Sequence, residues 1–182
     1  MHGIERRSDF RFSGPMSSPF RETASEPADL VAHIDGGSRG NPGPAAFAAV
    51  IKTADGGFVD EVSGFLGHTT NNVAEYQALL AALDYALTHK CRRLRVLADS
   101  ELLVRQINGA YKVKNHNLKP LYDQAKHLIA RLESFSIQHV YREENREADR
   151  LANRTLDAAN YKKPVRVNFQ DVESNPRRRE DA

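Results

Sequence analysis

Apolar residues gather in short, strand-like runs along the first part of the chain. Residues 30–35, 46–51 and 58–65 each have the composition of a β-strand. Glycine and proline predict a loop at residues 36–44, and the Asp-Gly-Gly string at residues 55–57 is a hairpin signal. The three runs therefore predict an antiparallel meander.

Helical spacing of apolar residues dominates the rest of the pattern. Residues 72–88 predict an amphipathic helix, and residues 94–99 predict a strand. Ser100 can cap a helix that stops near Asn108. A helix at residues 120–132 and a strand at 136–141 follow, and the last amphipathic helix carries Ala148, Leu151, Ala152 and Leu156. This order predicts an α/β fold with one mixed sheet, in which a meander adjoins crossover-linked parallel strands and helices flank the faces.

The flanking segments lack this periodicity. Residues 1–28 are polar and rich in serine and arginine, so we expect a disordered leader, and residues 161–182 predict a charged flexible tail. With no internal repeat, residues 29–160 are expected to form one domain.

Composition narrows the class of protein only a little. The 26 Lys and Arg residues against 24 Asp and Glu residues give a charge of +2, too small to indicate nucleic-acid binding by itself. Cys91 is the single cysteine and cannot form an internal disulfide, so we expect a buried spectator thiol. No apolar stretch approaches the roughly 20 residues of a membrane span. We expect a cytoplasmic protein without membrane contact.

Acidic residues stand at the ends of four predicted elements. Asp35 and Asp99 end strands, while Glu75 and Asp149 lie in the first turns of helices. Neighbouring strand ends form ligand sites in such sheets. Clustered carboxylates repel one another unless a divalent cation compensates their charge, and oxygen ligands favour Mg²⁺ or Mn²⁺.

Each acid also has a simpler interpretation. Glu75 could close a capping box with Asn72, and Asp149 could interact with the helix dipole. Asp35 and Asp99 could be solvated residues at strand ends. Four acids that each lie at an element end inside a distinctive string favour the metal site.

The strings around the four acids are Asp-Gly-Gly-Ser-Arg-Gly-Asn-Pro-Gly-Pro at residues 35–44, Thr-Asn-Asn-Val-Ala-Glu at 70–75, Asp-Ser at 99–100 and Asn-Arg-Glu-Ala-Asp at 145–149. Together they resemble the type 1 ribonuclease H family. The resemblance covers roughly residues 30–158. It implies a ribonuclease H-like fold with a five-stranded mixed sheet, and an endonuclease that hydrolyses the RNA strand of RNA/DNA hybrids.

The resemblance also assigns the acids to metal ions. Asp35 is shared by two Mg²⁺ ions, for which Mn²⁺ could substitute, with Glu75 and Asp99 on one ion and Asp149 on the other. One ion activates the attacking water and the other stabilises the leaving oxygen, which leaves 5′-phosphate and 3′-hydroxyl ends. We expect a monomer with no obligate protein partner.

Small polar residues are candidates for recognising the RNA 2′-hydroxyl group. They are Gly37, Ser38, Asn41, Asn71 and Asn72, although turn and cap chemistry explains the same residue types. By resemblance, Asn71 and Asn72 straddle the two strands near the cut.

The chain departs from better-known family members in two places. It lacks the catalytic histidine of the loop before the last helix, and Arg142 takes roughly that place, as in the archaeal-like and related bacterial branch. Arginine suits phosphate positioning or product release. His139 falls in a predicted strand, so we expect a structural role for it. A basic protrusion is also missing, which leaves Lys112 and Lys114 as candidates for the DNA strand or as solvated lysines.

Two other functions compete with the hybrid endonuclease. One is another nuclease of the ribonuclease H-like superfamily, such as an exonuclease, because paired metals serve several phosphoryl substrates. The other is a non-catalytic hybrid-binding domain. The four retained acids, and the asparagines beside Glu75, favour the endonuclease.

Overall fold

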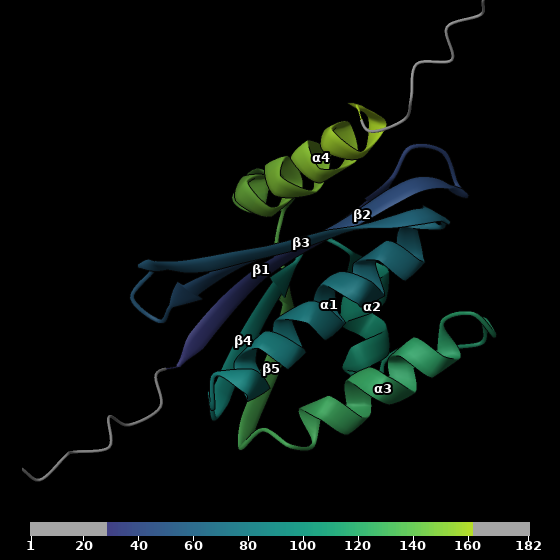
Figure 1. The fold of residues 1–182 in the computed structure, drawn as a ribbon. Coiled ribbons are helices and arrows are strands. Elements are labelled where there is room, and N and C mark those ends of the chain that lie inside the picture. The colour runs from purple at the N-terminus through teal and green to yellow at the C-terminus, as the bar shows by residue number, and fades with distance from the viewer. Residues whose placement is uncertain (1–28, 162–182) are drawn as a thin grey trace, which may run out of the picture.

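Strands and helices follow one another in the predicted order in the computed structural model, which describes residues 29–161 (Figure 1). The leader predicted at residues 1–28 and nearly all of the tail predicted at 161–182 lie outside the described residues. The elements in chain order are β1 (Leu30–Ser38), β2 (Gly43–Thr53), β3 (Phe58–Thr69), α1 (Asn71–Thr88), β4 (Arg93–Ala98), α2 (Glu101–Ile107), α3 (Lys119–Ile129), β5 (Ser134–His139), the 3₁₀ turn η1 (Arg142–Glu144) and α4 (Arg146–Tyr161).

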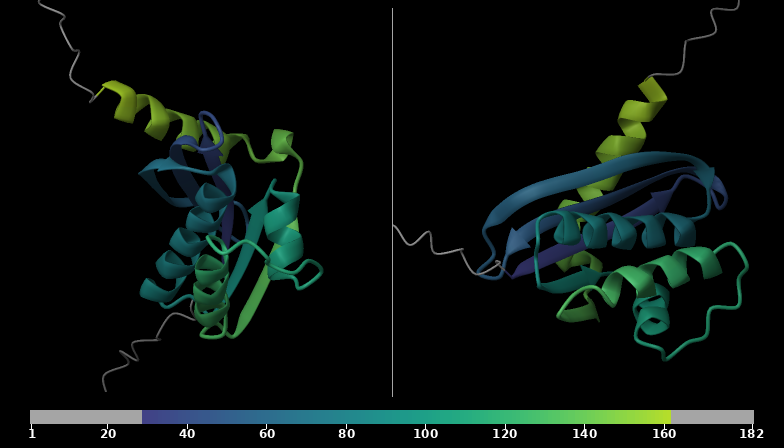
Figure 2. Two further views of the ribbon diagram at one scale, coloured as in Figure 1. Left: turned by 90° about the vertical axis from the view of Figure 1, so that its right-hand side faces the viewer. Right: turned by 60° about the horizontal axis from the view of Figure 1, so that its bottom comes forward.

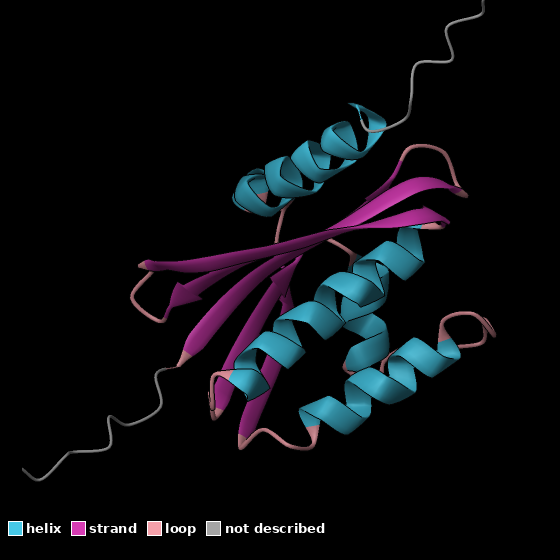
Figure 3. Cartoon of the chain, viewed as in Figure 1, coloured by secondary structure: helices cyan, strands magenta, loops and turns pink. Residues whose placement is uncertain are grey.

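All the strands belong to one five-stranded sheet with the order β3-β2-β1-β4-β5 (Figure 3). β1, β2 and β3 pair antiparallel, whereas β4 pairs parallel with both β1 and β5. The expected mixed sheet is therefore confirmed. β1 is its central strand, with the meander on one side and the parallel strands on the other.

Helices cover the two faces of the sheet unequally. α1, α2 and α3 lie on one face, and α4 crosses the other face over the meander (Figures 1 and 2). The larger apolar core fills the space between the sheet and α1 to α3, and it includes the buried Cys91. A smaller cluster lies under α4 and consists of Ala48, Val50, Ala148, Leu151 and Ala152. No described helix is long and apolar enough to cross a membrane.

Several predicted boundaries were wrong. The loop predicted at residues 36–44 is mostly strand, because β1 continues to Ser38 and Gly36 pairs with Phe47 of β2. Cross-strand pairing here outweighs the low strand propensity of glycine. The strand predicted at residues 136–141 is β5, two residues earlier, because pairing with β4 sets its register. The helix predicted to reach residue 132 ends at Ile129.

The start of α1 excludes the simpler interpretation of Glu75. Thr70 is the N-cap, and its side chain accepts a hydrogen bond from the Val73 N–H at 3.4 Å. A capping box between Asn72 and Glu75 is therefore absent. Glu75 lies beyond the first turn of α1 rather than within it, and it is buried.

Gly36 permits a close contact between β1 and α1. A Cβ atom at this position would lie 2.2 Å from the Ala74 carbonyl carbon and 2.2 Å from the Glu75 backbone nitrogen. We expect Gly36→Ala to lower the free energy of unfolding by at least about 1–3 kcal/mol, the usual cost of overpacking. Gly37→Ala is the matched control, because a Cβ there meets nothing within 4 Å. Equal denaturant midpoints for the two variants would contradict this close approach.

Candidate active site

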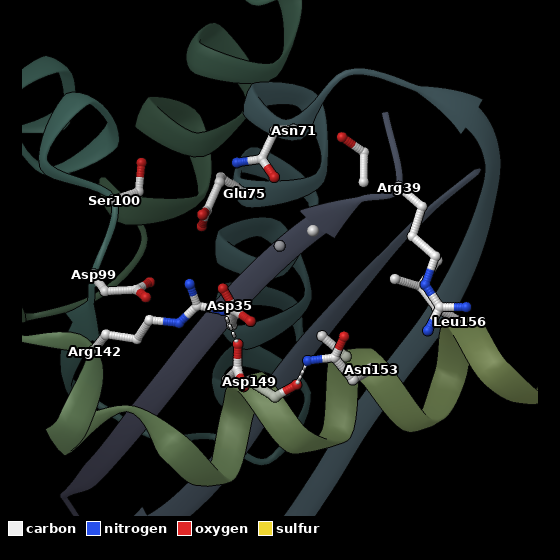
Figure 4. A pocket seen from close by; sticks show the side chains of 14 residues that line it. Asp35, Arg39, Asn71, Glu75, Asp99, Ser100, Arg142, Asp149, Asn153 and Leu156 are labelled. Carbon is white, nitrogen blue, oxygen red and sulfur yellow. Dashed lines mark hydrogen bonds and ion pairs between the residues drawn. The ribbon is translucent and has the colours of Figure 1, made fainter. Parts of the chain in front are cut away.

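One pocket opens where the central strand meets α1 and α4. Its walls come from β1, the start of α1, the end of β4, the η1 turn and α4. Figure 4 shows that the labelled acidic side chains point toward one another across this pocket. All four acids proposed from the sequence line it: Asp35, Glu75, Asp99 and Asp149.

Strand pairing brings the first two acids together. Ile34 of β1 pairs with Ala98 of β4, so the residues that follow them, Asp35 and Asp99, are neighbours across the sheet. Asp35 does not end its strand as predicted, because β1 continues for three more residues. The close approach at Gly36 adds Glu75 from α1, and Asp149 comes from the first turn of α4.

Three of these carboxylates form a tight cluster. One oxygen from each of Asp35, Glu75 and Asp99 lies within 4.8 Å of the others. Asp35 is 8% exposed and Glu75 is 5% exposed. Glu75 Oε2 is buried and has no hydrogen-bond partner among residues 29–161. Such a cluster is costly without a compensating positive charge.

Burial and mutual repulsion perturb the acidity of this cluster. Burial raises the pKa of Asp35 to about 6, and the charges of Asp99 and Asp149 add to the rise. Burial, followed by the charges of Asp35 and Asp99, raises the pKa of Glu75 well above its ordinary value. Both carboxyl groups therefore lose their protons at a higher pH than ordinary carboxyl groups do, and a bound cation would favour their ionised forms.

Arg142 pairs with the fourth acid. Its Nη2 atom donates a hydrogen bond to Asp149 Oδ1 at 2.8 Å. This bond and the charge of Asp149 raise the pKa of Arg142. Because the Arg142 side chain is 74% exposed, the pair lies at the mouth of the pocket. Asp149 is thus separate from the buried cluster of three.

The donor set fits a hard divalent cation. The cluster offers only carboxylate oxygens, which Mg²⁺ and Mn²⁺ prefer. A cation would supply a partner to the unpaired Glu75 oxygen and would favour the ionised forms of Asp35 and Glu75. Asp35, Glu75 and Asp99 could therefore hold a metal, with Asp149 close by.

The residues proposed for substrate binding are divided by the structure. Gly37, Ser38 and Asn71 line the pocket with the acids. Asn41 supports this wall, because its Oδ1 atom accepts a hydrogen bond from the Asn71 N–H at 3.2 Å. The remaining candidates are exposed and lie outside the lining of this pocket: Asn72, Lys112 and Lys114.

His139 does lie in a strand, as expected. It is at the end of β5, is exposed, and packs edge-on against Tyr141 with 5.9 Å between ring centroids. It is not part of the pocket lining.

Several lining residues were missed by sequence reasoning. They are Arg39, Ser100, Ala152, Asn153 and Leu156. Asn153 and Leu156 follow Asp149 at helical spacing, which could have placed them on the same wall. Asn145 was missed as well, although it lies inside a string that was noted, and its side chain contacts Asp99.

Comparison with known proteins agrees with this architecture. Residues 33–155 match the family model described as "Reverse transcriptase-like". The chain is 47% identical over 131 residues to the bifunctional protein Rv2228c of Mycobacterium tuberculosis, covering 71% of this chain and 36% of that protein. It is 42% identical over 128 residues to ribonuclease HI of Halobacterium salinarum, covering 70% of this chain and 64% of that protein.

Solved structures give the same result. The N-terminal RNase H domain of Rv2228c superposes with a TM-score of 0.71 at 44% identity, covering 74% of this chain and 97% of that chain. LC11-RNase H1 in complex with an RNA/DNA hybrid has a TM-score of 0.68 at 40% identity, covering 71% of this chain and 98% of that chain. The fold and its acidic pocket define a ribonuclease H-like protein, and this chain belongs to the ribonuclease H family. It spans only 36% of the length of the mycobacterial relative.

The raised pKa values predict a stability gain from Asp35→Asn when no metal is present. Between an ordinary Asp pKa of 3.8 and about 6, the folded protein binds more protons than the unfolded chain. The free energy of unfolding therefore falls as pH rises through this window. At pH 8 in chelator, we expect the free energy of unfolding of Asp35→Asn to be about 1–3 kcal/mol higher than that of the unaltered protein.

The gain should shrink toward zero as the pH falls below the ordinary Asp pKa of 3.8, because the carboxyl group is then protonated in both the folded and the unfolded state. Denaturant titrations at pH 8 and below this pKa measure it. Asp84→Asn is the control, because Asp84 is exposed on the same helix as Glu75. A lower free energy of unfolding for Asp35→Asn than for the unaltered protein at pH 8 would show that repulsion among the carboxylates does not destabilise the fold.

Proposed function

We propose that this chain is an endonuclease that hydrolyses the RNA strand of RNA/DNA hybrids, using two Mg²⁺ ions for which Mn²⁺ can substitute. The buried cluster of Asp35, Glu75 and Asp99 beside Asp149 carries the proposal, because it is set in a ribonuclease H fold. The binding of an RNA/DNA hybrid by a relative of similar structure supports the choice of substrate. A cytoplasmic location and a monomeric state remain predictions.

Asp35, Glu75 and Asp99 would hold one ion, and Asp35 and Asp149 would hold the other. When bound, such ions make water a stronger nucleophile and stabilise charge on the leaving oxygen, which accounts for 5′-phosphate and 3′-hydroxyl products. The protein contributes a fixed arrangement of carboxylates. Because each acid comes from a different element of one packed domain, the arrangement is set before substrate binds.

Residues on the rim of the pocket would bind the nucleic acid. Gly37 and Ser38 lie at the end of β1 and line the pocket. Because their side chains are absent or small, the backbone of a nucleic acid could approach the protein closely here. Asn71 can exchange hydrogen bonds with a ribose 2′-hydroxyl, which DNA lacks. Lys112 and Lys114 are exposed and could contact DNA phosphates outside the pocket.

Arg142 would act where other family members use a loop histidine. Its guanidinium group is at the pocket mouth and is paired with Asp149. If Asp149 held a metal ion, the exposed arginine would be free to contact a phosphate, to two oxygens of which it can donate two parallel hydrogen bonds. This exchange of partners would let Arg142 position the phosphate or assist product release.

Cleavage of matched duplexes tests the substrate and the reaction together. With internally labelled RNA/DNA, RNA/RNA and DNA/DNA duplexes, we expect Mg²⁺-dependent internal cuts in the RNA strand of the hybrid and none in chelator. Loss of terminal nucleotides alone would indicate an exonuclease. Binding without any cut would indicate a hybrid-binding domain.

Asp99→Asn tests the assignment of the site. Removing the charge of a metal ligand should lower kcat on the hybrid by more than about a hundredfold. Losing a residue that only hydrogen-bonds to a metal ligand already costs up to about a hundredfold, and a ligand should cost more. Hybrid binding, measured by fluorescence anisotropy, should persist. Asp123→Asn is a control on the exposed surface of α3. Normal turnover by Asp99→Asn would refute the site.

A further inference from the structure

Asn145 is a buried polar residue at the junction between η1 and α4. It is 1% exposed and lies among the largest fully buried side chains of the described chain. Its backbone N–H donates to the Arg142 carbonyl oxygen, and its own carbonyl oxygen accepts the Asp149 N–H at 3.1 Å. The residue is therefore fixed in the backbone that carries both Arg142 and Asp149.

The Asn145 side chain reaches the other side of the pocket. Its Nδ2 atom donates to the Ile34 carbonyl oxygen at 2.8 Å and to Asp99 Oδ1 at 3.3 Å. Ile34 directly precedes Asp35. One amide group thus links β1, the acid that follows β4 and the first turn of α4.

The two acceptors fix the orientation of the amide. Rotating it by half a turn would place Oδ1 against two other oxygens, so the nitrogen must face Ile34 and Asp99. Oδ1 is then buried and makes no hydrogen bond of normal geometry among residues 29–161, although the His33 side chain lies near enough to interact with it. Burying this oxygen is unfavourable, and the two hydrogen bonds that the amide nitrogen donates offset that cost. These two bonds explain why an asparagine is present.

We propose that Asn145 is a positioning residue for the metal ligands. Asp99 is only partly buried, and Asp35 and Glu75 repel its carboxylate whenever they are ionised. The amide of Asn145 holds that carboxylate in the cluster and anchors the turn that carries Asp149 against β1. The inference rests on the proposed function, because it requires a divalent cation in the site.

Metal binding without nucleic acid gives a direct test. Hydrogen-bond partners of metal ligands fix the ligands' orientation, and their loss weakens metal binding by about 10–100-fold. We expect Asn145→Ala to raise the Mn²⁺ dissociation constant, measured by calorimetry, by about tenfold or more. On the hybrid, kcat should fall while KM stays unchanged, since Asn145 does not touch the substrate.

Asn108→Ala is the matched control. Asn108 caps the C-terminus of α2 and donates the same amide hydrogen to a strand carbonyl, Ile137 O, at 3.2 Å. Unlike Asn145, it donates no described hydrogen bond to any of the four acids, so its loss should leave the Mn²⁺ dissociation constant unchanged. An unchanged constant in Asn145→Ala would overturn this inference alone. Failure of the unaltered protein to bind Mn²⁺ would overturn the proposed function as well.

A second measurement requires no variant to fold. In the nuclear magnetic resonance spectrum of the unaltered protein, the Asn145 side-chain amide protons should shift as Mg²⁺ saturates the site. Those of Asn108 should not move. An Asn145 signal that stays in place at saturating Mg²⁺ would overturn the positioning role.

Discussion

Repulsion among three neighbouring carboxylates is the constraint around which this molecule is built. Oxygens of Asp35, Glu75 and Asp99 lie within 4.8 Å of one another, and two of these residues are almost fully buried. Isolated in water, such groups would move apart or remain protonated. The folded chain holds them together at a cost that a bound cation would offset, so stability is exchanged for a preformed binding site.

Strand pairing and apolar packing hold the acids in place against this repulsion. β1 and β4 are parallel neighbours, which places Asp35 beside Asp99, and the apolar core under α1 holds Glu75 against Gly36. The smaller cluster under α4 positions Asp149 from the opposite face. Asp149 is kept apart by its bond to Arg142, so its charge already has a partner. The buried cluster of Asp35, Glu75 and Asp99 therefore needs a cation to balance its charge more than Asp149 does.

Much of this could be predicted from the sequence, because the informative residues lie at element ends. The four acids and the mixed sheet follow from local strings and periodicity, and Arg142 follows from the resemblance to the ribonuclease H family. The strand character of Gly36 could not, because it depends on pairing with β2 and on contact with α1. Asn145 was missed for a similar reason, since its partners Ile34 and Asp99 are remote in the sequence and only the fold brings them to it.

The central claim is that the cluster needs a cation to ionise fully, and the titration of Asp35 tests it most directly. Carbon-13 nuclear magnetic resonance of the side-chain carboxyl groups can follow this residue with and without Mg²⁺. The account predicts an apparent pKa of about 6 for Asp35 in chelator. With saturating Mg²⁺ the pKa should fall below its ordinary value. An ordinary pKa in chelator, or one that Mg²⁺ leaves unchanged, would contradict the account.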